Sequence, residues 1–528
     1  MPKVLISDKL SPAAVEIFRT RGIEVDLKPG LTPAELRAII GGYDGLAIRS
    51  ATKVTKELLD VATNLKVVGR AGIGVDNVDI KSATARGVVV MNTPLGNTIT
   101  TAEHAIAMMF ALARQIPEAS SSTKAGKWEK NRFMGVELSG KTLGLIGCGN
   151  IGSIVANRAI GLHMKVVSFD PYLSEKRAID LGVEKVELDT LLARADFITL
   201  HTPLTDATHN ILSREALAKT RKGVRIINCA RGGLLDEVAL AEAIASGHVA
   251  GAALDVFETE PATQNPLFAL ENVVCTPHLG AATAEAQENV ALQVAEQMSD
   301  FLLTGAVSNA INMASVSAED APRLKPYIEL CRLLGGFAGQ MTQAHEGVLR
   351  RVVIEYEGLA AALNHKPLSA AVLAGLLSPL MEGVNMVNAP VAARERGIDF
   401  SETVHDRPSE YQTLVRVTVE TENLTRSVAG TLFAGARPRI VEIKDIKVEA
   451  DFGRHMLYVT NQDKPGFIGR FGATLADAGI NIATFHLGRS RAGGDAICLV
   501  SVDDILPEHV LKTVRDLPLV MQAVALNF

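Results

Sequence analysis

Three residues whose side chains can do chemistry each follow an apolar segment with the pattern of a β-strand. Arg231 lies in INCARGGLLDE, Glu260 in DVFETEP and His278 in CTPHLGA. The carboxyl ends of parallel strands meet at one edge of a sheet, where open α/β sheets bind ligands, so we expect the three side chains to converge. A planar guanidinium can hold carboxylate and carbonyl oxygens together, an imidazole can exchange a hydroxyl proton, and a carboxylate can orient that imidazole.

These groups match what a hydride transfer between an alcohol carbon and a nicotinamide ring requires of a protein. We predict that Arg231 binds a substrate carboxylate, that His278 is the acid–base group and that Glu260 orients it. Each residue also has an ordinary alternative, namely a surface-loop arginine, a cap before a proline and a turn histidine. Their shared position at strand ends favours the catalytic interpretation.

A glycine-rich turn predicts the matching cofactor site. Residues 147–152 read GCGNIG, follow the strand TLGLIG and continue directly into the helical segment SIVANRAIGL. In this motif Gly147 makes the tight turn, Gly149 lets the backbone approach a pyrophosphate, and Gly152 packs the helix on the strand. Asp170 ends the next strand, where its carboxylate can bind ribose hydroxyls and would repel a 2′-phosphate, so we predict NAD rather than NADP. The alternative is a turn needed only for packing, with Asp170 as a cap.

The segments that carry these groups form two series of alternating strands and helices. The first series predicts a parallel sheet from strands at 4–7, 45–50, 65–72 and 87–92. The second predicts a six-stranded dinucleotide-binding sheet that begins with TLGLIG and continues at 165–170, 197–203, 224–230, 250–256 and 272–280. Helices at 100–117 and 284–305 would carry the chain out of the first domain and back, so the second domain is inserted into it.

Beyond about residue 315 the pattern changes to a mixed region and then to strand, helix, strand, strand, helix, strand, which is a ferredoxin-like order. The predicted class is therefore α/β throughout. We expect a flavodoxin-like substrate domain at 1–98 and 286–315, an inserted Rossmann NAD domain at 99–285, an α/β intervening domain at 316–450, and a ferredoxin-like domain at 451–528.

Composition agrees with this division and excludes several classes of protein. The 528 residues are too many for one core, and 47% apolar with only 4% aromatic residues suits sheets and helices packed from Ala, Val, Ile and Leu. A net charge of −6 with interspersed signs argues against nucleic acid. The five dispersed cysteines predict neither a disulfide framework nor a metal site, and they favour a reducing, cytoplasmic location. No apolar run is long enough to predict a membrane partner.

Additional motifs extend over nearly the whole chain. RSATKVT (49–55), VVGRAGIGVDNVD (67–79), NTPLGN (92–97) and GKWEKNRFMG (126–135), with the motifs above, closely resemble the D-3-phosphoglycerate dehydrogenases of the D-2-hydroxyacid dehydrogenase family. The resemblance implies NAD-dependent oxidation of 3-phosphoglycerate, the entry to serine synthesis, in a homodimer or homotetramer. Two rival interpretations are a glyoxylate or hydroxypyruvate reductase, which would use the same three residues, and an NAD-sensing corepressor. The long C-terminal extension counts against both.

The resemblance also implies which residues contact the ligands. For NAD these are Ile73, Gly147, Gly149, Asn150, Ile151, Gly152, Asp170, Thr202, Cys229, Ala230, Arg231, Asp255, His278, Leu279, Gly280 and Ala281. For the substrate they are Arg49, Ser50, Gly72 and Gly74, together with Arg231 and His278. A basic turn could add positive charge to the site from this or a neighbouring subunit, or could simply be a solvated loop; it contains Lys124, Lys127, Lys130 and Arg132.

The last block resembles an ACT regulatory module. Such modules pair in this family and can bind serine between them, and the matching positions are Asn461, Asp463 and Asn481. Two alternatives stay open, because Asp463 could be an ordinary helix N-cap and Asn481 an ordinary turn residue.

Overall fold

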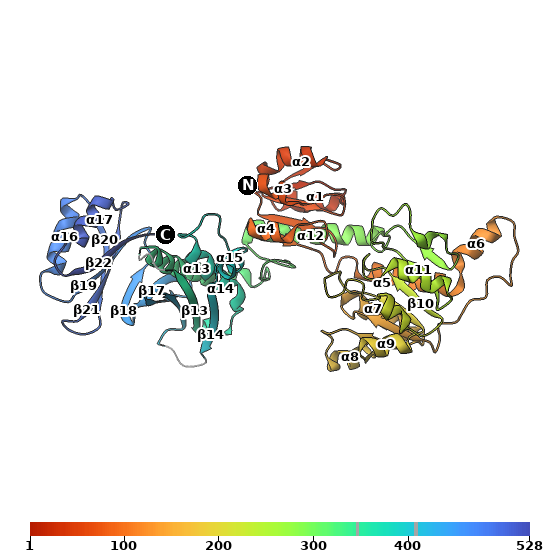
Figure 1. Ribbon diagram of the computed structural model, residues 1–528. Helices are drawn as coiled ribbons and strands as arrows, with labels where there is room; N and C mark the ends of the chain where they lie inside the picture. The colour runs from red at the N-terminus through yellow and green to blue at the C-terminus, as the bar shows by residue number, and fades with distance from the viewer. Residues whose placement is uncertain (345–347, 406–409) are drawn as a thin grey trace.

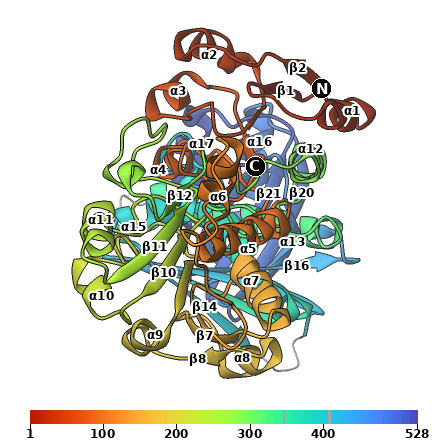
Figure 2. The same cartoon turned by 90° about the vertical axis from the view of Figure 1, so that its right-hand side faces the viewer.

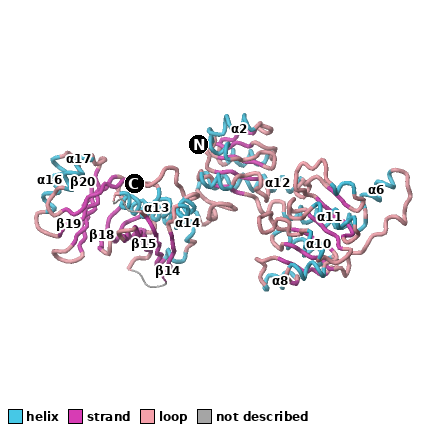
Figure 3. Tube along the Cα trace, viewed as in Figure 1, coloured by secondary structure: helices cyan, strands magenta, loops and turns pink. Residues whose placement is uncertain are grey.

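The computed structural model describes residues 1–344, 348–405 and 410–528, which form four β-sheets along an elongated molecule (Figures 1 and 3). The second sheet lies at one end of the molecule and the fourth at the other, with the first and third between them (Figure 1). The predicted α/β class is confirmed. Within the described residues, no helix has both the length and the apolar character needed to span a bilayer.

The first sheet is parallel and has the strand order β2-β1-β3-β4-β5, the flavodoxin-like order. Its strands are β1 (Lys3–Ile6), β2 (Glu24–Leu27), β3 (Gly45–Ile48), β4 (Val67–Arg70) and β5 (Val89–Met91). One face is covered by α1 (Pro12–Thr20) and α12 (Ala284–Thr304), and the other by α2 (Pro33–Ile39), α3 (Lys56–Val61) and α4 (Ile80–Ala85). Because α12 comes from far along the chain, the predicted return of the chain to this sheet is confirmed.

The second sheet is also parallel, in the order β12-β11-β10-β9-β6-β7-β8. Its strands are β6 (Thr142–Ile146), β7 (Lys165–Phe169), β8 (Glu184–Lys185), β9 (Phe197–Leu200), β10 (Val224–Asn228), β11 (Val249–Leu254) and β12 (Val273–Cys275). Its helices are α5 (Thr98–Arg114), α7 (Asn150–Gly161), α8 (Glu175–Leu181), α9 (Leu188–Arg194), α10 (Arg214–Ala218) and α11 (Glu237–Ala245). Figure 2 views this half of the molecule end-on.

Two details of this sheet differ from the sequence prediction. The sheet has seven strands rather than six, because the two-residue strand β8 pairs with β7. It is too short to leave a periodic pattern. The single helix predicted at 100–117 is two helices, α5 and α6 (Ile116–Lys124), separated by Gln115 in the left-handed region at φ 51°. Pro117 occupies the first turn of α6, where a proline starts a helix without losing a hydrogen bond.

The third sheet has the order β14-β13-β15-β16-β17-β18, with β13 and β14 parallel and the other neighbours antiparallel. Its strands are β13 (Leu349–Gly358), β14 (Asp399–His405), β15 (Thr413–Thr421), β16 (Thr425–Phe433), β17 (Arg437–Ile443) and β18 (Ile446–Asp451). Its helices are α13 (Ala321–Gln343), α14 (His365–Leu377) and α15 (Ala389–Glu395). Helices α13 and α14 approach closely, since a Cβ added to Gly335 would lie 2.1 Å from the carbonyl oxygen of Val372.

The fourth sheet is antiparallel, in the order β20-β21-β19-β22, and confirms the predicted ferredoxin-like order of elements. Its strands are β19 (His455–Gln462), β20 (Ile482–Arg489), β21 (Asp495–Val502) and β22 (Val520–Asn527), and its helices are α16 (Phe467–Asp477) and α17 (Glu508–Arg515). The helices cover one face. The other face joins the core of the third sheet through Met456, Tyr458, Ile497, Leu499, Val524 and Leu526.

Candidate functional site

His278 and Glu260 form a hydrogen-bonded pair beyond the ends of β11 and β12. The Nδ1 atom of His278 lies 2.7 Å from Oε2 of Glu260. The other carboxylate oxygen of Glu260 accepts a hydrogen bond from the Phe257 backbone N–H at 3.1 Å, which fixes the carboxylate. A histidine whose Nδ1 donates to a carboxylate presents Nε2 as the proton acceptor. The predicted pair is thus assembled in a geometry suited to acid–base chemistry.

The backbone at His278 is unusual for a residue other than glycine. Its φ of 56° lies in the left-handed region, and its N–H donates to the Asp255 carbonyl at 2.9 Å. A non-glycine residue held in this region often marks a functional position, because the surrounding structure must enforce it. The turn that follows β12 therefore directs the imidazole toward its carboxylate partner.

Asp255 is the residue that holds this turn in place. It is fully buried, and its carboxylate accepts hydrogen bonds from the Leu279 N–H at 2.7 Å, the Gly280 N–H at 2.8 Å and the Thr276 hydroxyl at 2.6 Å. Burial alone would raise the pKa of Asp255, but hydrogen bonds from His104, Thr276 and Leu279 outweigh it and hold the pKa below its usual value. The carboxylate is therefore an ionised anchor of the turn that carries His278.

His104 of α5 is a member of this site that sequence reasoning missed. Its Nε2 lies 3.2 Å from Oδ1 of Asp255 and 3.3 Å from the hydroxyl of Thr276. The residue sits inside a helical segment, and no local motif marks it. Only the packing of α5 against the second sheet brings it to Asp255.

Arg231 lies three residues beyond β10, and its loop packs against the segment that leads to Glu260. A Cβ added to Gly232 would lie 1.9 Å from the Phe257 carbonyl oxygen, so only glycine allows this contact. The Nε of Arg231 donates to Oδ2 of Asp76 at 2.9 Å, and the guanidinium lies against the backbone of Gly74. Arg231 thus comes from the second sheet and contacts the loop that follows β4 of the first sheet.

A second arginine lies at the same loop, and sequence reasoning missed it as well. Arg70 ends β4, and its guanidinium covers Gly72, where an added Cβ would lie 1.6 Å from Nη1. Burial, followed by repulsion from Arg231 and Arg49, lowers the pKa of Arg70 to about 10. Its buried Nε makes no hydrogen bond to any described residue. The strand-end rule that singled out Arg231 also applies to VVGR, so this signal was present in the sequence.

Arg49 lies on the neighbouring loop of the first sheet. Buried Asp8 accepts hydrogen bonds from the Arg49 N–H at 2.6 Å and from the Thr52 N–H and hydroxyl at 3.1 and 2.7 Å, which sets the course of residues 49–52. Ser50 is exposed on this loop. Arg49, Arg70 and Arg231 are close enough to influence one another electrostatically, and the carboxylates of Asp76 and Asp8 offset part of their positive charge.

The glycine-rich turn has the geometry expected of a pyrophosphate site. Gly147 has a φ of 92°, and an added Cβ would lie 2.6 Å from the His201 carbonyl oxygen. A Cβ on Gly152 would lie 2.1 Å from the Gly147 carbonyl oxygen, so this glycine packs α7 on the turn. Around Gly149 the space is open, and α7 begins at the next residue, Asn150. Gly147 and Gly152 therefore make the tight turn and the helix packing predicted for them, whereas the contact of Gly149 with a pyrophosphate stays a prediction. Backbone N–H groups at the start of α7 are available to an anion.

Asp170 directly follows β7 and faces this turn. Its Oδ2 accepts a hydrogen bond from the Cys148 N–H at 2.8 Å, and its Oδ1 accepts one from the Tyr172 N–H at 2.8 Å. The cap that we considered as an alternative is thus present. It does not exclude ribose binding, because an ionised carboxylate has about four lone-pair sites and only two are used here.

Other predicted NAD positions follow the ends of other strands, namely Thr202 after β9, Cys229 after β10 and Ile73 after β4 of the first sheet. Thr202 lies beside Gly147, as does the backbone of His201. Burial of the His201 ring lowers its pKa to about 4 and keeps it neutral. Cys229 is buried, which raises the pKa of its thiol well above the usual value. The carbonyl of Ile73 accepts a hydrogen bond from the Asn92 side-chain amide at 2.6 Å.

The basic turn after α6 lies away from the predicted substrate residues. In Figure 1, α6 lies at the outer end of the second sheet, away from the first sheet, and Figure 2 shows it nearest the viewer. Arg132 is paired with Glu129 and with Glu271, each at 3.2 Å. Within one chain, this turn does not reach the predicted substrate residues.

The predicted effector residues do not meet within one chain. Asn461 pairs with Ala496 near the start of β21, whereas Ile482, which follows Asn481, pairs with Val502 at its end. Asp463 accepts hydrogen bonds from Arg489 at 2.9 Å and the Gly493 N–H at 3.0 Å, and these bonds lower its pKa. Its interpretation as an N-cap is wrong, because Gly466 is the N-cap of α16. Asn481 donates to Asp503 at 2.7 Å.

Comparison with protein families finds three matches along the chain. Residues 106–280 match the NAD-binding domain of D-isomer specific 2-hydroxyacid dehydrogenases. Residues 323–444 match the D-3-phosphoglycerate dehydrogenase intervening domain, and residues 455–519 match the ACT domain. The NAD-binding and ACT assignments predicted from sequence are confirmed.

Curated relatives match over nearly their whole lengths. The chain is 44% identical to D-3-phosphoglycerate dehydrogenase of Bacillus subtilis, over 98% of each chain. It is 43% identical to the same enzyme of Synechocystis, over 97% of this chain and 92% of that one. It is 41% identical to that of Methanocaldococcus jannaschii, over 100% of both chains.

Solved structures cover a little over half of the chain. The TT0316 protein from Thermus thermophilus is 37% identical, with a TM-score of 0.54, and covers 58% of this chain and 99% of its own. A D-lactate dehydrogenase from Escherichia coli is 30% identical, with a TM-score of 0.53, and covers 59% and 100%. The curated relatives above also match the C-terminal extension.

Proposed function

The chain belongs to the D-3-phosphoglycerate dehydrogenase family of D-isomer specific 2-hydroxyacid dehydrogenases, and from this membership we propose how its residues work. Its reaction is the NAD-dependent oxidation of 3-phospho-D-glycerate to 3-phosphohydroxypyruvate. The observation that carries the proposal is the His278–Glu260 pair at the sheet edge where Arg231 meets the arginine-bearing loops of the first sheet.

The glycine turn and Asp170 are the residues that hold NAD. The open backbone at Gly149 and the start of α7 receive the pyrophosphate, and the unused lone pairs of Asp170 accept the adenosine ribose hydroxyls. When bound, NAD supplies the acceptor for the hydride that leaves C2 of the substrate.

Arg231 binds the substrate carboxylate. Its Nε is occupied by Asp76, which orients the guanidinium and leaves Nη2 beside Gly74 for the substrate. Arg49, Arg70 and Ser50 lie on the first-sheet side and receive the phosphate. Three guanidinium groups against a substrate that carries a carboxylate and a phosphate favour this substrate over an unphosphorylated acid.

His278 receives the proton of the substrate C2 hydroxyl at Nε2 as the hydride departs, which leaves a carbonyl at C2. The imidazolium so formed is stabilised by the Glu260 carboxylate at Nδ1. In the reverse direction the same nitrogen returns the proton. Asp255 acts through the turn that it anchors and is a positioning residue.

A substrate comparison tests this function. Purified full-length chain should form NADH from NAD and 3-phosphoglycerate with a kcat/KM at least tenfold higher than with glycerate, which lacks only the phosphate. In the reverse direction, 3-phosphohydroxypyruvate should be preferred over glyoxylate. A preference for glyoxylate would indicate a glyoxylate reductase instead, and a chain that binds NADH without turnover would indicate a sensor.

We also propose that the domains are residues 1–98 with 286–315, 99–285, 316–450 and 451–528. Each range contains one sheet, which supports this division, and the boundaries of the inserted domain fall at the starts of α5 and α12. A homodimer or homotetramer would cover the exposed apolar side chains of Trp128 and Met134, which are 86% and 81% exposed. The described cysteines are all free, which supports a cytoplasmic location.

We propose that serine binds between ACT domains of two subunits. Asn461 and Asp463 lie at one end of the fourth sheet and Asn481 at the other, so a site that uses all three requires two copies. Serine should raise the Tm of the wild type by several degrees at saturation and that of Asp463→Ala by less. Asp477→Ala, at the end of α16, is the matched control and should respond like the wild type.

Mixed subunits make this test sharper. A dimer of one Asp463→Ala and one Asn481→Ala subunit has one site with both changes and one site with neither. Unfolding and refolding the two variants together should therefore restore part of the serine response that each lacks alone. Equal serine-induced Tm shifts in the wild type and Asp463→Ala would show that Asp463 does not belong to a serine site. If the mixture responded to serine no more than either variant alone, the site would lie within one subunit.

A further inference from the structure

Residues 72–76, which follow β4, form a loop between two arginines of the candidate substrate site. At one end of this substrate loop the Arg70 guanidinium covers Gly72, where an added Cβ would lie 1.6 Å from Nη1. Further along, an added Cβ at Gly74 would lie 1.8 Å from Nη2 of Arg231, which comes from the second sheet. The course of the loop backbone therefore sets where the two guanidinium groups can meet a substrate.

Thr93, two residues beyond β5, clamps the start of the substrate loop. Its hydroxyl accepts a hydrogen bond from the Gly72 N–H at 2.6 Å, and its own N–H donates to the Gly72 carbonyl at 3.0 Å. The side chain is fully buried, and Gly72 has a φ of 143°, which residues other than glycine rarely adopt. Without the hydroxyl, the buried Gly72 N–H would lose its acceptor, and other positions of the loop would be favoured.

Asn92 holds the next residue of the substrate loop. Its side-chain amide is buried and donates to the Ile73 carbonyl at 2.6 Å. The backbone of Asn92 is itself held from two directions. Its carbonyl accepts a hydrogen bond from Nε2 of Gln297 on α12 at 2.8 Å, and its N–H donates to the Asn309 carbonyl at 3.2 Å. The loop is therefore tied to two segments that lie more than 200 residues further along the chain.

Asn309 belongs to the strap, which we define as residues 305–320 between α12 and α13. The strap lies along the edge strand β5, where Met91 and Ala310 form an antiparallel bridge. Asn309 has a φ of 54°, and its side-chain amide donates to Oε1 of Gln297 at 3.1 Å. Gln297 is buried and uses both ends of its amide, so it joins the strap to the residue that holds the loop.

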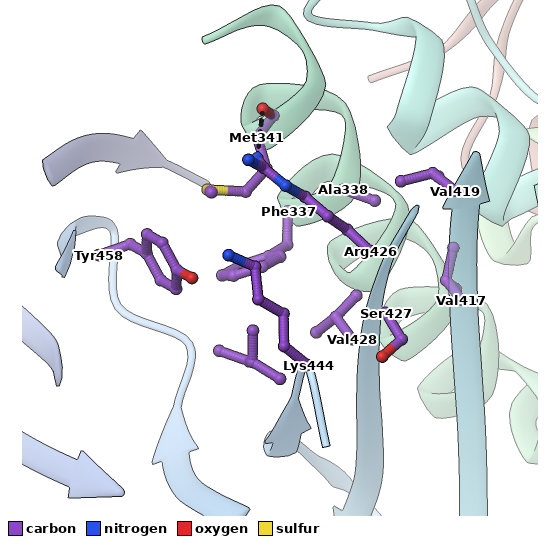
Figure 4. Close-up of a pocket in the computed structure, with 11 residues that line it drawn as sticks. Phe337, Ala338, Met341, Val417, Val419, Arg426, Ser427, Val428, Lys444 and Tyr458 are labelled. Atoms are coloured by element: carbon purple, nitrogen blue, oxygen red, sulfur yellow. Dashed lines mark hydrogen bonds between the residues drawn. The ribbon is translucent and has the colours of Figure 1, made fainter. Parts of the chain in front are cut away.

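The far end of the strap is fixed by the third and fourth sheets. Helix α13 begins at Ala321, directly after the strap, and packs in the core that these sheets share. Within this core the rings of Phe337 on α13 and Tyr458 on β19 meet edge to face, with centroids 5.9 Å apart (Figure 4). Asn385 makes a second attachment, because its side-chain amide donates to the Gly87 carbonyl just before β5 at 2.9 Å. Strand β5 is thus held both at its start and along its edge.

We propose that Thr93, Asn92 and Asn309 are positioning residues that set the substrate loop for binding of the phosphorylated acid. This inference rests on the proposed function, because it places the substrate between the guanidinium groups of Arg70 and Arg231. Thr93 and Asn92 hold the loop directly, and Asn309 acts on it through the network of buried amides. The strap therefore contributes to substrate affinity without contacting the substrate.

An isosteric substitution at the clamp tests the proposal. Thr93→Val should lower kcat/KM for 3-phosphoglycerate at least tenfold, with most of the change in KM, because the loop contacts the substrate before and during hydride transfer. Thr93→Ser keeps the hydroxyl and should retain kcat/KM within threefold of the wild type. The NADH dissociation constant of Thr93→Val should also stay within threefold, since the glycine turn and Asp170 lie on the second sheet.

Thr431→Val is the matched control for this substitution. The Thr431 side chain is also buried, and its hydroxyl forms a hydrogen bond with a backbone group, the Thr413 carbonyl, but both residues belong to the third sheet. This variant should keep the kcat/KM of the wild type.

A double-mutant cycle tests the action of the strap. Asn309→Gly removes the side-chain amide and keeps a residue suited to a φ of 54°, whereas Asn92→Ala removes the bond to the Ile73 carbonyl. Each variant should lower kcat/KM for 3-phosphoglycerate at least threefold. The double variant should lose less than the product of the two losses, because both changes act on one network. Losses that simply multiply would exclude Asn309 from positioning the loop and overturn this part of the proposal.

Turnover of 3-phosphoglycerate by the wild type separates the failure of this inference from that of the proposed function. If the wild type does not oxidise 3-phosphoglycerate, both are overturned. If it does, unchanged kcat/KM in Thr93→Val, or equal losses in Thr93→Val and Thr93→Ser, would overturn the inference alone. A rise in the NADH dissociation constant as large as the rise in KM would overturn it as well, since it would indicate a general loss of structure. Asn309→Gly changes a half-buried residue, so the cycle does not depend on how Thr93→Val folds.

Discussion

Replacing His278 with asparagine is expected to lower kcat for 3-phosphoglycerate oxidation by a factor of about 10²–10⁴, the usual contribution of a general acid–base group. Asparagine tolerates the left-handed backbone that His278 adopts at φ 56°, so the turn after β12 should persist. The contacts of the glycine turn and Asp170 do not involve the imidazole. The NADH dissociation constant, measured by fluorescence titration, should therefore stay within about twofold of the wild type.

His163→Asn provides a control with the same substitution in the same backbone region. His163 has a φ of 59° and lies just beyond α7, where its backbone forms hydrogen bonds with Ile160 and Gly140. This variant should keep wild-type kcat. A His278→Asn variant that retained more than a tenth of wild-type kcat would contradict the assignment of His278 as the acid–base group.

Replacing Arg231 with alanine is expected to lower kcat/KM for 3-phosphoglycerate by about 10²–10⁴. The loss corresponds to two charge-assisted hydrogen bonds of roughly 1.5–3 kcal/mol each. The fall should appear in both KM and kcat, because the guanidinium holds the carboxylate before and during hydride transfer. Arg231→Lys should fall between alanine and the wild type, since lysine keeps the charge but lacks the planar fork that contacts Asp76 and the substrate together.

Arg214→Ala is the matched control for this series. Arg214 lies on the surface helix α10, where it forms an ion pair with Glu242. This helix packs on the second sheet, the sheet whose strand β10 precedes Arg231. Its removal should leave kcat/KM unchanged, as exposed ion pairs contribute little. Steady-state kinetics with varied 3-phosphoglycerate at saturating NAD give both constants. Values for Arg231→Ala within threefold of the wild type would exclude Arg231 from substrate binding.

We propose that Arg70 contributes to substrate choice together with the residues that have recognisable motifs. Its guanidinium is buried beside Gly72 and is influenced by Arg231 and Arg49, so positive charge is concentrated where the first sheet contacts the second. On this proposal, the charge of the loop separates phosphorylated from unphosphorylated acids, because it acts on the part of the substrate that differs.

Much of the fold was predictable because its signals are local. Strand and helix periodicity, the glycine turn at 147–152 and the change of pattern near residue 315 are read within windows of a few residues. The same holds for Arg231, Glu260 and His278, each of which follows its own strand. Local patterns did not predict β8, because a strand of two residues is too short to show a period. They also did not predict that Gln115, in the left-handed region, divides one helix into two.

Local sequence pattern was enough to identify the side chains at the ends of parallel strands, and with them the class of chemistry, since that pattern sets strand direction and sheet edge. The partners of these side chains became visible only in the folded chain. Asp76 lies 155 residues from Arg231, and His104 approaches Asp255 from a helix that carries no motif. The folded chain likewise places Asn461 and Asn481 at opposite ends of one sheet. Such contacts depend on how sheets and helices pack against each other, and packing is set by the whole chain rather than by any segment of it.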